Sequence, residues 1–244
     1  MMLIDACCTI GAERDPEPPA EQLLREMDRA GVDRAVVHPP DRCFAWENEA
    51  GNELTTAAAR EHADRLIAAV TVNPWRPEAW DRLRQALEAG GKVLTFAPGV
   101  QGFVVGSKKL DPILENLANN DIDVPIYIHT GHHSHAAPSQ LFLLARRFPA
   151  MTFIMGHSGS TDYALDVVPV CRQSTNVYME SSFTGALGFV RRLADVGWEK
   201  GIMGSGFPYY DLSFAWSELR RLLPVEHHEA VLGGNLGRLL GGVP

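Results

Sequence analysis

The sequence predicts a single (β/α)8 TIM barrel that covers residues 1–244, and three observations lead to this fold class. Short apolar runs alternate strictly with amphipathic stretches, which predicts parallel strands joined by helices. The alternation occurs eight times, and eight strand–helix units close naturally into a barrel. The chain has 244 residues, a length that suits one barrel and requires no second domain.

The strands are expected where short, mostly apolar runs are bounded by turn residues. The second run ends before Pro39 and Pro40, because a proline disfavours helix in the residue before it and cannot donate to a strand ladder. The expected strands are residues 3–7, 34–37, 66–72, 92–96, 124–128, 152–155, 176–179 and 201–203.

The helices are expected between these runs. In the first helix, Pro19 suits the first turn, Leu23 and Met27 fall on one face, and Gly31 ends the helix. The later helices are expected over residues 49–60, 78–89, 112–119, 139–147, 163–171, 187–196 and 213–223, followed by a short helical tail. A doubly wound open sheet is the alternative architecture. It is disfavoured because no glycine-rich dinucleotide fingerprint follows the first strand.

Composition and charge narrow the classes of partner. The formal net charge of −8 argues against nucleic acid or an anionic membrane as the partner. No stretch approaches the roughly 20 apolar residues of a membrane span, and the first residues do not resemble a signal peptide. The four cysteines do not form a disulfide framework. We therefore expect a cytoplasmic protein with a small-molecule substrate, and self-association as a homo-oligomer is a further expectation.

Polar and titratable residues stand where the expected strands end. The carboxyl ends of barrel strands meet at one rim, and the active site of such a fold lies there. A single histidine at a strand end is more often a structural hydrogen-bonding residue, but three histidines at one rim indicate metal or acid–base chemistry. The residues expected to line a cleft at this rim are Cys7, His38, Asn73, His129, His157 and Glu180.

Two loops near this rim carry further candidates. Residues 97–110 form the longest expected loop, contain three glycines, and are a candidate lid over the cleft. Phe103 in this loop is a candidate substrate contact together with His38 and Asn73, and packing in the core is the alternative for Phe103. His133 and His135 lie two apart after the fifth strand; we interpret them as a polar lining of the pocket mouth rather than as metal ligands.

Five short motifs occur in order along the chain. They are Ile-Asp-Ala-Cys-Cys-Thr-Ile-Gly at residues 4–11, Pro-Ile-Tyr-Ile-His-Thr-Gly at 125–131, the segment 148–159 that ends in Gly-His-Ser-Gly, Gly-Ser-Gly-Phe-Pro at 204–208, and the tail at 231–241. Together they resemble the amidohydrolase-related family of metal-dependent hydrolases over nearly the whole chain. The resemblance implies a barrel enzyme of the branch that includes decarboxylases similar to aminocarboxymuconate semialdehyde decarboxylase, and lactone or ester hydrolases.

The resemblance also implies five functional positions, and three of them carry other residues in this chain. Cys7 and Thr9 stand where the family has two metal-binding histidines, and Gly206 stands where it has an aspartate. His129 and His157 match the family pattern. Because cysteine is a good soft ligand, the candidate metal ligands are Cys7, His129 and His157. The expected cofactor is a divalent metal such as zinc, held weakly or not at all.

Three functions remain open from the sequence. The first is a hydrolase or lyase that acts on a small molecule at the rim with an altered or weak metal site. The second is a metal-independent enzyme in which Cys7 is the nucleophile or acid and His129 or His157 is the base. The third is a binding protein that keeps the barrel without its chemistry. For an enzyme, the candidate catalytic residues are His129, His157 and Glu180.

Overall fold

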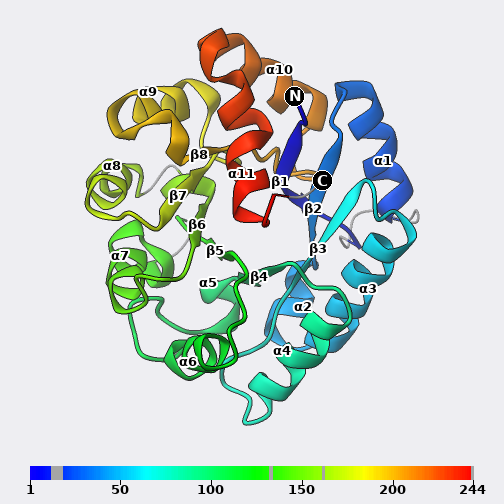
Figure 1. The fold of residues 1–244 in the computed structure, drawn as a ribbon, viewed down its shortest axis with the longest axis vertical. Helices are drawn as coiled ribbons and strands as arrows, with labels where there is room; N and C mark the ends of the chain where they lie inside the picture. The colour runs from blue at the N-terminus through cyan, green and yellow to red at the C-terminus, as the bar shows by residue number, and fades with distance from the viewer. Residues whose placement is uncertain (12–18, 132–133, 161–162, 243–244) are drawn as a thin grey trace.

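The structure, a computed structural model, describes residues 1–11, 19–131, 134–160 and 163–242. Eight parallel strands lie side by side in the order β1 to β8, and helices surround them (Figure 1). The fold is therefore the single-domain (β/α)8 barrel that the alternation predicts. In the described part of the chain, no helix is both long enough and apolar enough to cross a membrane.

The strands match their expected positions closely. They are β1 (Ile4–Thr9), β2 (Arg34–His38), β3 (Leu66–Val70), β4 (Val93–Phe96), β5 (Ile126–His129), β6 (Phe153–Gly156), β7 (Val177–Glu180) and β8 (Gly201–Ile202). The third strand ends two residues before the expected end, because the side chain of Asn52 binds both backbone groups of Thr71. Asn52 Oδ1 accepts from Thr71 N at 2.8 Å and Asn52 Nδ2 donates to Thr71 O at 2.8 Å.

The helices cover the outside of the barrel. The larger ones are α1 (Pro19–Ala30), α3 (Asn48–Glu61), α4 (Ala79–Glu88), α6 (Asp111–Asn119), α7 (Pro138–Arg147), α8 (Ala164–Gln173), α9 (Ala186–Val196) and α10 (Leu212–Leu222). Two short helices that the sequence did not predict, α2 (Asp41–Ala45) and α5 (Pro98–Gln101), lie in the loops after β2 and β4. The expected tail is α11 (Asn235–Leu239).

Backbone hydrogen bonds between β1 and the segment after β8 complete the ring. Ala6 N donates to Met203 O at 2.9 Å, and Thr9 N donates to Phe207 O at 2.7 Å. This closure brings the carboxyl ends of the first and last strands together. Residues that follow β8 can therefore face the same space as residues at the end of β1.

A small apolar cluster fills the barrel interior and closes one of its ends. Ile4, Val36 and Ile154 project inward from three strands, and Leu236 of α11 packs against them. In Figure 1, α11 lies across the middle of the barrel, close to the start of β1. Burying an aliphatic side chain of this size contributes roughly 1.5–3 kcal/mol. The amino-terminal end is thus covered, and the opposite end, the C-terminal rim, is available for a binding site.

The segment 97–110 is anchored over much of its length. Besides containing α5, it buries Val105 and Leu110 in the core. Phe103 is also buried and meets Phe96 edge-on, with 6.1 Å between the ring centres. Phe103 therefore packs in the core and is not among the residues that line the rim cavity described below.

Candidate active site

A cavity of about 300 Å³ lies among residues at the carboxyl ends of the strands. All five positions that the resemblance implies line this cavity, namely Cys7, Thr9, His129, His157 and Gly206. Its other described lining residues are Asp41, Phe44, Ala97, Gly99, Val100, Thr130, Ala136, Phe183 and Tyr209. The structure thus brings together residues from the first strand, Cys7 and Thr9, and residues that follow the last strand, Gly206 and Tyr209.

Strand β1 presents Cys7 and Thr9 to the cavity, because residues two apart on a strand share one face. Cys8 between them points away; its Sγ lies 3.7 Å from Ser205 Oγ and it packs in the layer beneath the helices. Burial, followed by the nearby charge of Glu180, raises the pKa of the Cys7 thiol well above its usual range. Burial therefore disfavours the thiolate, which is the nucleophilic form of cysteine.

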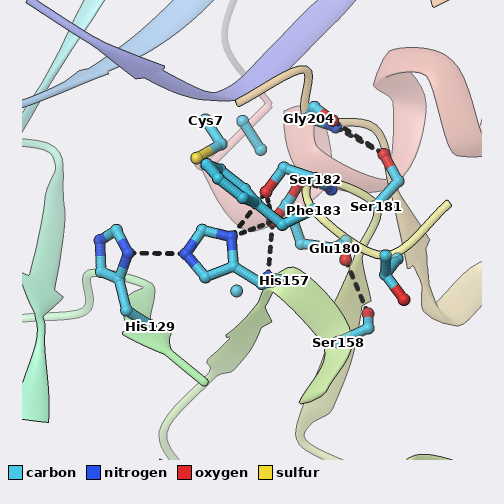
Figure 2. Close-up of polar contacts among 12 residues, drawn as sticks. Cys7, His129, His157, Ser158, Glu180, Ser181, Ser182, Phe183 and Gly204 are labelled. Atoms are coloured by element: carbon cyan, nitrogen blue, oxygen red, sulfur yellow. Dashed lines mark hydrogen bonds and ion pairs between the residues drawn. The ribbon is translucent and has the colours of Figure 1, made fainter. Parts of the chain in front are cut away.

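His129 and His157 form a close pair on the cavity wall. His129 is the last residue of β5 and His157 follows β6 directly. His129 Nδ1 lies 2.8 Å from His157 Nε2 (Figure 2). The backbone at His157 is left-handed, with φ +63°, as is that of Ser158, with φ +40°. This conformation costs a non-glycine residue roughly 1–2 kcal/mol, and such strain is concentrated at functional sites.

Glu180, at the end of β7, holds the backbone of this strained turn by a hydrogen bond. It is fully buried; its Oε2 accepts hydrogen bonds from His157 N at 2.9 Å and from Tyr127 Oη at 2.7 Å. Ser182 donates to the same carboxylate through Oγ, at 2.7 Å to Oε2, and through its backbone N, at 2.6 Å to Oε1. Burial raises the pKa of Glu180, and these hydrogen bonds oppose the rise. Glu180 therefore holds His157 in place and does not line the cavity wall.

His38 lies next to His129, with 5.7 Å between the ring centres, and is fully buried. Its Nε2 donates to Ala6 O at 2.9 Å, since a carbonyl can only accept, and its Nδ1 lies 3.2 Å from the Thr95 hydroxyl. The ring therefore ties β2 to β1 and β4. It is not among the residues that line the cavity.

The buried position of His38 leads to a pH prediction. Burial lowers the pKa of His38 from about 6.5 to about 4. Between these values the unfolded chain binds more protons than the folded chain. His38 therefore leaves the free energy of unfolding unaffected above pH 6.5 and lowers it as the pH drops toward 4. The full shift in the pKa corresponds to about 3 kcal/mol of unfolding free energy. Urea unfolding of wild type and His38→Gln at pH 7 and pH 5 should show a smaller loss in the variant, because glutamine keeps an N–H donor but does not titrate. Equal losses would contradict this origin of the pH dependence.

The remaining predicted residues hold loops rather than face the cavity. Asn73 Nδ2 donates to Ala45 O at 2.7 Å, and Asn73 Oδ1 accepts from Trp75 N at 3.0 Å. In segment 97–110, the predicted lid, the cavity is bordered by the early residues Ala97, Gly99 and Val100. His135 is exposed, and His133 lies outside the described residues.

Sequence reasoning missed several residues of the site. Phe44 and Phe183 place aromatic rings edge-on against His129 and His157, at 5.3 and 4.7 Å between ring centres. Ser182 was also missed, although its place two residues after the end of β7 is a signal that could have identified it. Phe44 carried no comparable signal, because it lies on the unexpected helix α2.

The side chains present do not fit a tightly held divalent ion. The ligand atoms of Cys7, His157 and Glu180 lie within 4.8 Å of one another, but each is already engaged. Burial disfavours the thiolate form of Cys7, Glu180 accepts the four hydrogen bonds described above, and the nearest nitrogens of the two histidines bond to each other. A catalytic zinc site generally needs three available protein ligands.

The backbone conformation and the neighbours of Gly206 leave no room for an acidic side chain after β8. Gly206 has φ +79°, and a Cβ at this position would lie 2.7 Å from a ring atom of Phe183. An aspartate there would require Phe183 to move, and that ring packs against His157. The structure therefore explains physically why the acidic side chain implied by the resemblance does not fit at Gly206.

Comparison with known proteins relates this geometry to a family. A sequence model of the amidohydrolase family matches residues 19–242. A solved TIM-barrel protein of uncharacterized function from Bordetella bronchiseptica is 18% identical, with a TM-score of 0.81 over 99% of both chains. The 2,6-dihydroxybenzoate decarboxylase from Rhizobium is 12% identical, with a TM-score of 0.75 over 99% of both chains. The 5-carboxyvanillate decarboxylase from Novosphingobium aromaticivorans, solved with manganese, is 16% identical, with a TM-score of 0.76 over 98% of this chain and 97% of that one. A search of curated proteins found no match.

Proposed function

The chain belongs to the amidohydrolase family, and on this premise we propose that it is a hydrolase or lyase that acts on a small molecule in the rim cavity. The observation that carries the proposal is the 2.8 Å contact between His129 Nδ1 and His157 Nε2 on the cavity wall. Imidazole is the side chain best suited to move protons near neutral pH. Hydrolysis needs a base to deprotonate water, and decarboxylation needs an acid to protonate the carbon that loses CO2. The pair serves either reaction.

The lining of the cavity favours a small, flat substrate. Phe44, Phe183 and Tyr209 supply aromatic rings, while Thr9 supplies a hydroxyl group. A mainly apolar pocket with a few polar groups is the usual form of a small-molecule site, and about 300 Å³ is at the small end of the usual range. Two of the similar structures are, by their names, decarboxylases of aromatic acids. An aromatic carboxylic acid or a small ester therefore suits this cavity.

The same proposal predicts weak metal binding. After dialysis, elemental analysis of wild type should find well under one divalent ion per chain, because burial disfavours the Cys7 thiolate and the nearest nitrogens of His129 and His157 already bond to each other. A Cys7→His, Thr9→His variant should retain more metal, since both positions face the cavity and imidazole is a strong zinc ligand. Adding His129→Ala to that variant should lower its metal content again. One tightly held ion per wild-type chain would overturn this prediction.

The function itself can be tested with two panels of compounds. Small aromatic carboxylic acids are assayed for CO2 release, and small esters and lactones for acid release, each with EDTA and with added Mn²⁺ or Zn²⁺. Turnover that survives EDTA would support the metal-independent form of the proposal, and turnover that appears only with metal would support the weak-metal form. Binding without turnover across both panels would favour a binding protein and overturn the proposed catalysis.

A further inference from the structure

Four side chains form a continuous line of contacts that starts in the buried part of the site and ends at the cavity. Glu180 Oε2 lies 2.7 Å from Ser182 Oγ, and Ser182 Oγ lies 2.7 Å from His157 Nδ1. His157 Nε2 in turn lies 2.8 Å from His129 Nδ1. Figure 2 shows Ser182 between the Glu180 carboxylate and the His157 ring, with His129 on the other side of that ring.

Serine, and not the carboxylate, makes the link to the ring. Glu180 Oε2 lies 3.8 Å from His157 Nδ1, which is too long for a hydrogen bond. Both oxygens of Glu180 accept from backbone N–H groups, of His157 and Ser182, and such groups can only donate. The hydroxyls of Ser182 and Tyr127 also donate to Oε2, so Glu180 is the acceptor in each of these hydrogen bonds.

The direction of each bond then follows from the number of protons. The Ser182 hydroxyl has one proton and gives it to the bond with Glu180, so Ser182 Oγ accepts from His157 Nδ1–H. A neutral imidazole carries one N–H, so His157 Nε2 is an acceptor. The short contact with His129 Nδ1 then requires His129 to donate. Every bond in the line therefore points toward Glu180: His129 donates to His157, His157 donates to Ser182, and Ser182 donates to Glu180.

We propose that Ser182 is a positioning residue that fixes His157 in the tautomer with the proton on Nδ1, and thereby orients the His129–His157 pair for proton transfer. The identity of the protonated nitrogen is set by the partner of the other nitrogen, and Ser182 is the partner that Glu180 holds by both its hydroxyl and its backbone N. This inference rests on the proposed function, in which the pair moves the proton.

The test compares two adjacent serines. Ser182→Ala removes the hydroxyl that accepts from His157. Ser181→Ala is the matched control, because Ser181 Oγ bonds to Gly204 O and Gly204 N, each at 3.0 Å, and points away from the histidines in Figure 2. Ser182→Thr keeps a hydroxyl at the position and should restore the wild-type behaviour.

The first readout needs no substrate. Nitrogen-15 NMR of histidine-labelled wild type at neutral pH should show His157 protonated on Nδ1, with His157→Ala used for assignment. Ser182→Ala should lose this signature, and Ser181→Ala should keep it. A wild-type spectrum with the proton on His157 Nε2 would overturn the inference without any variant, even if Ser182→Ala fails to fold.

The second readout is kinetic, with a substrate from the panels. Ser182→Ala should lower kcat by roughly 10–100-fold with KM nearly unchanged, the usual size of an effect exerted through a neighbouring group, while Ser182→Thr and Ser181→Ala stay close to wild type. Unchanged kcat in Ser182→Ala would overturn the positioning role. If the tautomer is as inferred but His157→Ala retains full turnover, the proposed function fails and the tautomer assignment stands.

Discussion

Replacing His157 with alanine is expected to lower kcat by roughly 10²–10⁴-fold, the usual contribution of a positioned acid–base group. His157 lines the cavity, contacts His129 at 2.8 Å and is held by Ser182 and Glu180. His129→Ala should lower kcat to a similar extent, and the double variant should be little worse than either single one, because residues that act as a unit are not additive. The measurement is initial-rate kinetics with a substrate identified by the panels.

The matched control is His62→Ala. His62 follows α3 and precedes β3, so it lies at the opposite end of the barrel from the cavity. It should retain wild-type turnover. Thermal unfolding of each variant separates lost chemistry from lost folding. Wild-type turnover in folded His129→Ala and His157→Ala would remove the catalytic role of the pair.

Periodicity explains why the fold was predictable. Each strand is a short, buried apolar run, and the helix residues Leu23 and Met27 repeat at helical spacing and are fully buried. Local patterns of this kind are set by the sequence near each element. The exceptions have identifiable causes: the end of β3 depends on Asn52, which lies 19 residues away from Thr71, and α2 and α5 are too short to show a period.

The site was predictable only where a residue stands at a strand end and its side chain points inward. His129 and His157 satisfy both conditions, and Cys7 points inward from two residues before the end of β1; all three line the cavity. His38 and Glu180 also end strands, but buried hydrogen bonds hold their side chains away from the cavity wall. The direction of a side chain beyond the strand depends on contacts between distant segments, which spacing alone does not reveal.

Gly131 supplies the prediction with the largest expected effect on stability. It lies two residues after His129 and has φ +95°. A Cβ there would lie 2.2 Å from the carbonyl carbon of Gly159 and 2.5 Å from Ser160 N. Because these are backbone atoms, they cannot rotate away as a flexible side chain would. Gly131→Ala should therefore destabilise the protein by roughly 3 kcal/mol or more, which corresponds to a fall in Tm of roughly 6–12 °C for a domain of this size.

The matched control is Gly31→Ala, because Gly31 also has a left-handed φ, of +68°, but an added Cβ would meet nothing within 4 Å. This control isolates the backbone penalty, and we expect a loss of about 1 kcal/mol. Thr130, next to Gly131, accepts from Gly159 N at 2.9 Å, so forcing the two loops apart should also separate His129 from His157. We therefore expect folded Gly131→Ala to lose turnover as well as stability, while Gly31→Ala retains full turnover. Equal stability of the two variants in urea unfolding would show that the loops after β5 and β6 do not approach so closely.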